Sequence, residues 1–263
     1  MSKLIDRLTR VSQAAAHPMG FRAARSAAAM PRMQLVAALA KADANASDYV
    51  VGADAGLVRV AGVDSGARAI KKAADAVQDI PWGAWLEAHA LGQLGQVSSL
   101  NCDFVVFPAA GTALAVPPAG GPGMVLQVDS SVPEGQLRTA NDLAVDAVLV
   151  TAEQEGPGPL TWHQLMLWRR FAGLLTAPLL VCIPNGTGTD ELQLLWEAGI
   201  GGVVVAAGPD SSPGELKRLR EAIDGLAPPS PRKKRHSEAL LPRMERAAEP
   251  AVEIGEEDED EDD

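Results

Sequence analysis

Charged side chains that could do chemistry follow three of the apolar runs in this sequence. Glu87 and Asp129 each stand directly at the end of such a run, and Lys41 follows a third run by two residues. Carboxylates can act as general acids or bases or bind a divalent cation, and a lysine can act as an electrophile or form a Schiff base. Glu87, Asp129 and Lys41 are therefore the candidate catalytic residues. Solvation of ordinary loops is the alternative explanation for each of them taken singly.

Two short glycine-containing loops near the end of the apolar part of the chain could bind an anion. The first holds Asn185, Gly186 and Thr187, and the second holds Gly208 and Ser211. Each loop precedes a predicted helix, whose first backbone N–H groups have no partner within the helix and attract negative charge. These five residues are the candidate phosphate-binding residues. Turn and helix-cap chemistry explains both loops as well.

The sequence offers little evidence of motifs for metal binding or for nucleophilic catalysis. Cys102 and Cys182 are far apart, and no histidine pair has the spacing of zinc ligands, so we predict no metal site. His89 is the one histidine close to the candidate catalytic residues. The sequence contains neither a Gly-x-Ser-x-Gly elbow nor a Walker-type loop, and it identifies no cofactor.

Eight apolar runs are placed to hold these residues. They alternate between runs led by a proline and runs led by an aspartate or a glycine pair, and they alternate with amphipathic helical segments. This pattern is typical of a parallel sheet covered by helices. The predicted strands are 33–39, 49–53, 82–87, 103–107, 124–129, 146–151, 179–183 and 202–207.

Eight such units in about 200 residues indicate closure into a (β/α)8 barrel, and an open doubly wound sheet is the alternative. The barrel is expected over 31–226. Its first helix should be stunted, since 40–47 leaves room for barely two turns. The segment 111–123 is rich in proline and glycine, so it cannot hold a long helix and should lie over one end of the barrel.

The two ends of the chain differ from this body. Residues 1–30 form an N-terminal extension, in which 3–15 places Leu4, Leu8 and Val11 on one helical face and should close the bottom of the barrel. Residues 227–263 form a charged tail, with a basic cluster and then an acidic run, and this composition predicts disorder.

Composition limits the partners. The net charge is −11, and the eight acidic residues of 256–263 carry most of it. No segment of the body is strongly basic, so we expect no nucleic-acid ligand for the barrel. No apolar stretch reaches the length of a membrane span, and the first residues lack the apolar core of a signal peptide, which predicts a cytoplasmic protein. Partners to expect are a small anionic metabolite, and a second copy or another protein bound through the tail.

The layout over 31–226, and best over 177–208, resembles the aldolase-type, phosphate-binding TIM-barrel superfamily. Asn185-Gly186 replaces the double glycine usual in that superfamily, and Asp210 would repel a phosphate. The resemblance implies a lyase, isomerase or synthase acting on a small phosphorylated or carboxylated metabolite. The alternative is a non-catalytic barrel that serves as a binding or assembly module through its terminal extensions.

Geometry separates these two hypotheses. An open pocket on which Lys41, Glu87 and Asp129 converge favours the enzyme. A barrel mouth filled by Phe107, Trp85 or the 111–123 loop favours the module.

Overall fold

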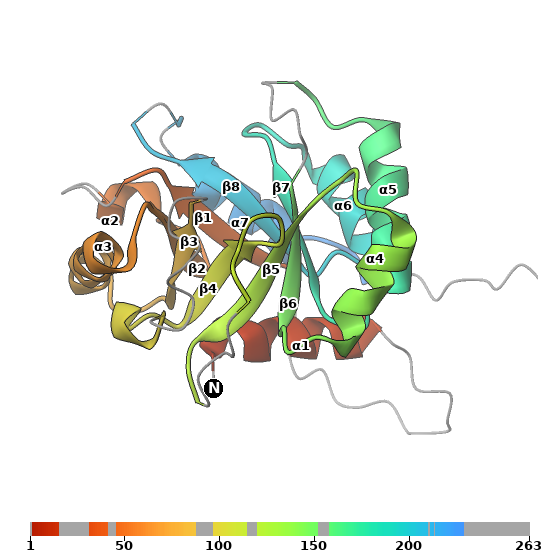
Figure 1. Cartoon of the computed structure of the whole chain (residues 1–263). Helices are drawn as coiled ribbons and strands as arrows, with labels where there is room; N and C mark the ends of the chain where they lie inside the picture. Colours follow the sequence, from red (N-terminus) through yellow and green to blue (C-terminus); the bar gives the residue numbers. More distant parts are fainter. Residues whose placement is uncertain are drawn as a thin grey trace, which may run out of the picture. The chain divides into compact units, whose positions relative to one another are not determined.

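Eight parallel strands close into a barrel in the sequence order β1 to β8, and β1 pairs with β8 to complete the closure (Figure 1). The computed structural model describes residues 2–15, 32–41, 46–87, 97–114, 120–151, 158–209, 211–212 and 214–228. The (β/α)8 barrel predicted from the alternation of apolar runs is confirmed.

The strands alternate with helices over most of the barrel. The strands are β1 (Gln34–Leu39), β2 (Ala55–Val60), β3 (Trp82–Leu86), β4 (Phe104–Pro108), β5 (Gly123–Asp129), β6 (Ala147–Thr151), β7 (Leu179–Ile183) and β8 (Gly202–Ala207). The helical elements are α1 (Lys3–Ala15), α2 (Ala46–Tyr49), α3 (Val63–Ala76), α4 (Glu134–Thr139), the 3-10 turn η2 (Ala140–Asp142), α5 (Trp162–Leu174), α6 (Thr189–Ala198) and α7 (Glu215–Asp224).

The second strand is the one strand whose predicted position is wrong. The prediction was 49–53, but α2 ends at Tyr49 and β2 begins at Ala55. A strand at 49–53 is unsuitable because Gly52 has a φ of +96° and Val51 is 56% exposed. The predicted stunted first helix is present as the single turn of α2.

Aspartates form hydrogen bonds that join adjacent strands at the amino-terminal end of the barrel, which we call its lower end. Asp54 accepts the backbone N–H of Leu35 at 2.8 Å and donates its own N–H to the Leu35 carbonyl at 2.8 Å. Asp146 does the same with Met124, at 2.7 and 2.8 Å. Each aspartate therefore joins the start of an even-numbered strand to the preceding strand. Asp54 directly precedes β2, so it lies at the end of the barrel opposite to the candidate site residues.

Helix α1 closes this lower end, as predicted, and lies across the base of the strands in Figure 1. Leu4 and Leu8 are fully buried in the cluster of side chains that fills the barrel. Asp103 accepts the backbone N–H groups of Lys3 at 2.7 Å and Leu4 at 3.0 Å, so it caps a helix about a hundred residues away in sequence. A side chain at Gly123 would come within 2.5 Å of α1, so β5 starts with glycine.

The barrel interior is apolar at the bottom and polar at the top. Its lower part contains Leu57, Phe104, Leu149 and Leu180, all buried. Closer to the carboxyl ends of the strands, the side chains that β2, β5 and β6 direct into the barrel are polar. A change from apolar to polar layers at the carboxyl ends of the strands is where barrels of this kind place their sites.

Some expectations fall outside the described residues or are met only in part. Residues 97–100 form a 3-10 turn, but the rest of the helix predicted over 91–100 lies outside the described residues. So do 115–119 of the loop between β4 and β5, and the tail from 229 onward. None of the described helices is long and apolar enough to cross a membrane.

Candidate functional site

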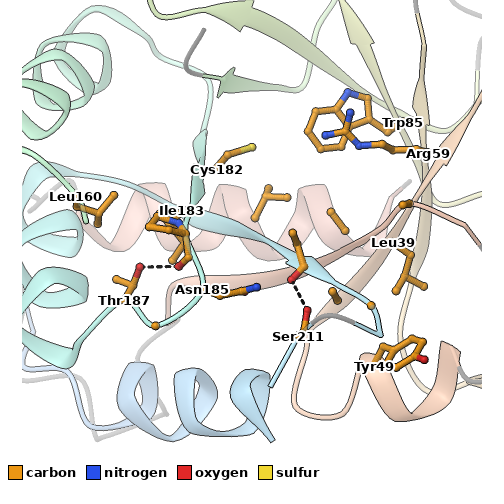
Figure 2. Close-up of a pocket in the computed structure, with 18 of the residues that line it drawn as sticks. Leu39, Tyr49, Arg59, Trp85, Leu160, Cys182, Ile183, Asn185, Thr187 and Ser211 are labelled. Atoms are coloured by element: carbon orange, nitrogen blue, oxygen red, sulfur yellow. Dashed lines mark hydrogen bonds between the residues drawn. The ribbon is translucent and has the colours of Figure 1, made fainter. Parts of the chain in front are cut away.

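A pocket of about 960 Å³ opens at the carboxyl ends of β1, β7 and β8. Its floor includes side chains that β2 and β3 direct inward, and its rim includes the loops after β1, β7 and β8 (Figure 2). Six of the eight predicted site residues line it. They are Lys41, Asn185, Gly186, Thr187, Gly208 and Ser211.

The two predicted catalytic carboxylates do not line this pocket. Asp129 accepts the backbone N–H of Ser131 at 2.7 Å, so its carboxylate stabilises the turn after β5. Glu87 is exposed after β3, and its backbone N–H continues the sheet by donating to the Val60 carbonyl at 3.0 Å. Lys41, Glu87 and Asp129 therefore do not meet in one pocket.

In the loop after β7, hydrogen-bond donors are paired with acceptors of the chain itself. The backbone N–H of Gly186 donates to the buried carboxylate of Glu215 at 2.8 Å. The backbone N–H of Gly188 donates to Glu191 at 2.7 Å, which completes a capping arrangement at the start of α6. The Thr187 hydroxyl donates to the Pro184 carbonyl at 2.8 Å. Three donors that a bound phosphate would use are thus already paired.

The loop after β8 is more open. The Ser211 hydroxyl donates to the Ala206 carbonyl at 3.2 Å, and its backbone N–H donates to the Gly208 carbonyl at 3.0 Å (Figure 2). No atom would lie within 4 Å of a side chain at Gly208, so the backbone there faces open space. Asp210 lies outside the described residues.

Sequence reasoning missed Arg59, which forms the floor of the pocket together with Trp85, a residue expected only as one that could fill the barrel mouth. The Arg59 guanidinium lies over the Trp85 ring, 4.2 Å from its centroid, and Figure 2 shows the pair set apart from Thr187 and Ser211. The signal was present in Ala55-Gly-Leu-Val-Arg-Val60, where Ala55, Leu57 and Arg59 share one face of a strand. The misplaced second strand concealed it.

Hydrogen bonds with side chains of β5 and β6 hold Trp85, on β3, in place. Its indole N–H donates to Gln127 Oε1 at 2.7 Å, and Gln127 Nε2 donates to Thr151 Oγ1 at 3.2 Å. Thr151 Oγ1 donates in turn to the Val128 carbonyl at 3.4 Å. These bonds fix the indole ring, which is 5% exposed, and the ring supports the guanidinium above it.

The charges of the pocket are unevenly placed. Among the described residues that line it, Lys41 and Arg59 bring two positive charges and Glu191 one negative charge, a net formal charge of +1. None of the carboxylates in the described part of the chain forms an ion pair with Lys41 or Arg59. Both cations are exposed to the pocket and are available to an anion.

The described residues contain no group of three or more His, Cys, Asp or Glu side chains able to hold a metal ion. Burial raises the pKa of Cys102 to about 12, so its thiol is a poor nucleophile. Cys182 lines the pocket. His89 lies outside the described residues.

Comparisons with known proteins bear on the fold. No protein-family model matches the chain, and no curated protein matches it. Solved structures do: a mutant tryptophan synthase alpha subunit from the hyperthermophile Pyrococcus furiosus is 15% identical, with a TM-score of 0.52 over 74% of this chain and 98% of that one. The alpha subunit of the same organism that was studied by X-ray analysis and calorimetry is 13% identical, with a TM-score of 0.51 over 74% and 97%.

The chain has a (β/α)8 TIM-barrel fold, and these solved structures are similar to it in fold. At 13–15% identity the likeness shows the fold alone. The pocket lies at the carboxyl ends of the strands, where the sequence predicted it. The pocket is open although Trp85 occupies its floor, so it satisfies neither of the two geometric criteria in full.

Proposed function

We propose that the protein binds a small carboxylated or phosphorylated metabolite in the mouth of the barrel. The observation that carries this proposal is the Arg59 guanidinium, which faces the pocket without a carboxylate partner among the described residues. Arginine presents several N–H donors in one plane, a shape that matches carboxylate and phosphate groups. The anionic group of the metabolite binds Arg59, and Lys41 adds a second positive charge from the rim.

The activity class is that of a lyase, isomerase or synthase. Among the described residues that line the pocket, Lys41, Glu191, Tyr49 and Cys182 carry groups able to move a proton, and Lys41 could also attack a carbonyl as an amine. Catalytic roles for Glu87 and Asp129 remain predictions from the sequence, and a ligand reaching beyond the pocket would be needed to contact them. The fold supports this class by analogy, since most barrels of this type are enzymes.

A non-catalytic barrel is the second candidate, and one observation favours it. The N–H groups of Gly186 and Gly188 are paired with carboxylates of the chain itself, so the loop after β7 is built as a closed turn. In this case the pocket serves as a binding site only, and the terminal extensions recruit a second copy or another protein.

A thermal-shift screen tests the proposal. The probes are sugar phosphates, small carboxylates and divalent cations, applied to the wild type, to Arg59→Gln and to Arg169→Gln, which removes an exposed arginine on α5 as a matched control. At 100 times its dissociation constant, a ligand stabilises the native state by about 2.7 kcal/mol. We expect stabilisation of the wild type and the control by at least one anion and its loss in Arg59→Gln. Flat melting curves for every anion would contradict the proposal.

Activity separates the two candidates. Anions that stabilise the protein are then incubated with it and followed by NMR, with Lys41→Gln as the comparison. Conversion by the wild type and not by Lys41→Gln supports the enzyme. Binding without conversion in the presence of the full set of probes supports the binding module.

A further inference from the structure

We infer that the ligand of this pocket is a monocarboxylate with an apolar body and not a phosphate ester. The inference rests on the proposed function, because it assumes that Arg59 receives an anion, and it narrows the class of that anion. An arginine alone does not distinguish the two groups, since its planar set of donors fits both carboxylate and phosphate. The rest of the pocket makes the distinction.

In the loop after β7, two backbone donors of the kind that hold a phosphate are occupied. A phosphate group offers three or more acceptor oxygens and is commonly held by several backbone N–H groups in a glycine-containing loop. In the loop after β7 the Gly186 N–H is held by Glu215 at 2.8 Å and the Gly188 N–H by Glu191 at 2.7 Å. Glu215 is 7% exposed and also forms an ion pair with Arg218. These contacts hold the Glu215 carboxylate in place against the Gly186 N–H.

The charge of the described residues that line the pocket matches a single negative charge. Among them, Lys41 and Arg59 with Glu191 give a net formal charge of +1. A phosphate monoester carries close to two negative charges at neutral pH. The carboxylate of Glu191 repels this more highly charged group more strongly than it repels a monocarboxylate.

The remaining walls suit an apolar body. Leu160, Ile183 and Tyr49 line the pocket, and Figure 2 shows Leu160 and Ile183 on the side of the loop after β7 and Tyr49 near Leu39. The Trp85 indole N–H donates to Gln127 Oε1 at 2.7 Å, which fixes the ring. The Arg59 guanidinium lies over this ring, so the ring holds the guanidinium in one orientation. A planar carboxylate bound side-on to this fixed guanidinium forms two parallel hydrogen bonds.

Matched pairs of probes test the inference by titration calorimetry on the full chain. Each pair shares its apolar body and differs in its anion: benzoate with phenyl phosphate, 3-phenylpropanoate with 2-phenylethyl phosphate, and butanoate with propyl phosphate. We expect the carboxylate of the best pair to bind roughly tenfold more tightly than its phosphate partner. Arg59→Gln should weaken this binding about ten- to a hundredfold, and Arg169→Gln should leave it unchanged.

A second variant examines the cause of the preference. Glu191→Gln keeps an oxygen that can accept the Gly188 N–H but removes the negative charge from the pocket, so the preference for carboxylate should narrow by roughly two- to fivefold. An unchanged preference in this variant contradicts the charge argument.

The outcomes distinguish this inference from the proposed function. Tighter binding of the phosphate member in every pair overturns the inference and leaves the proposed function standing, provided that Arg59→Gln abolishes binding. If no probe of either series binds at about millimolar concentration, both fail. Carboxylate binding that persists in Arg59→Gln also overturns both, because the anion then lies elsewhere.

Discussion

At the scale of single residues, the pocket depends on a charged side chain resting on a fixed aromatic ring. A cation over an indole face at a partly exposed site contributes about 0.5–1 kcal/mol, so the Arg59–Trp85 contact orients the guanidinium more than it stabilises the fold. The hydrogen bonds from Trp85 through Gln127 to Thr151 fix the ring. The proposed anion-binding role of Arg59 therefore also depends on Gln127 and Thr151, which are not among the residues that line the pocket.

Replacing Gln127 with leucine tests this dependence. The indole N–H of Trp85 would lose its acceptor inside the barrel, where water cannot readily replace it, so the variant should lose about 1–3 kcal/mol of unfolding free energy. Urea unfolding measures the loss. Gln136→Leu, at an exposed position of α4, is the matched control and should change little. Equal losses in both variants would contradict the role given to Gln127.

The two cysteines should differ in reactivity. Burial raises the pKa of Cys102 from 9.0 to about 12, so at about pH 8 roughly one thiol in ten thousand is a thiolate. In Cys182→Ser, which keeps Cys102, labelling by a disulfide reagent should be slow until denaturant unfolds the chain. Rapid labelling of the folded protein would contradict the burial of this thiol.

The same shift predicts a pH effect on stability. The raised pKa means that the folded state resists losing the Cys102 proton, so the contribution is present below about pH 9 and is lost as the pH rises toward about 12. Between about pH 8 and pH 10, the wild type should therefore lose more unfolding free energy than Cys102→Ser. An identical pH dependence for the two proteins would show that this thiol does not contribute.

At the scale of elements, an aspartate stands directly before β2, β4 and β6, whereas β8 follows Gly201. The predicted second strand began after Asp48 instead of Asp54, because a tyrosine and two valines follow Asp48. These residues belong to a helical turn and to an exposed turn ending at Gly52. Tertiary pairing decides between two short apolar runs of this kind, and local pattern does not.

Asp103 links two elements that lie far apart in the chain. Replacing it with alanine leaves the Lys3 and Leu4 N–H groups without their acceptor and should lower the unfolding free energy by about 1–2 kcal/mol. Hydrogen exchange should become faster in α1 first, because the cap holds that helix against the barrel. Asp142→Ala, at an exposed position, is the control. Unchanged exchange in α1 would contradict the capping role.

At the scale of the whole molecule, strand order and closure follow from periodicity, whereas the content of the pocket does not. Eight alternating runs sufficed to predict the barrel, the closing helix at 3–15 and the end of the barrel where the pocket lies. Which inward positions meet at that end depends on strand register, and β2 begins six residues later than predicted, an error that removed Arg59 from consideration. Local sequence also gave no sign that Glu215 would reach back to Gly186 across 29 residues.

The central claim is that an anion binds at the floor of the pocket, above Trp85. The most direct measurement is the indole N–H region of a ¹⁵N–¹H NMR spectrum, in which the five tryptophans give five signals and Trp85→Phe assigns the one from the floor. During titration with 3-phenylpropanoate we expect the Trp85 signal to shift and saturate, while the exposed Trp162 on α5 does not respond. A Trp85 signal that stays in place through the titration, or a response confined to other tryptophans, would contradict the account.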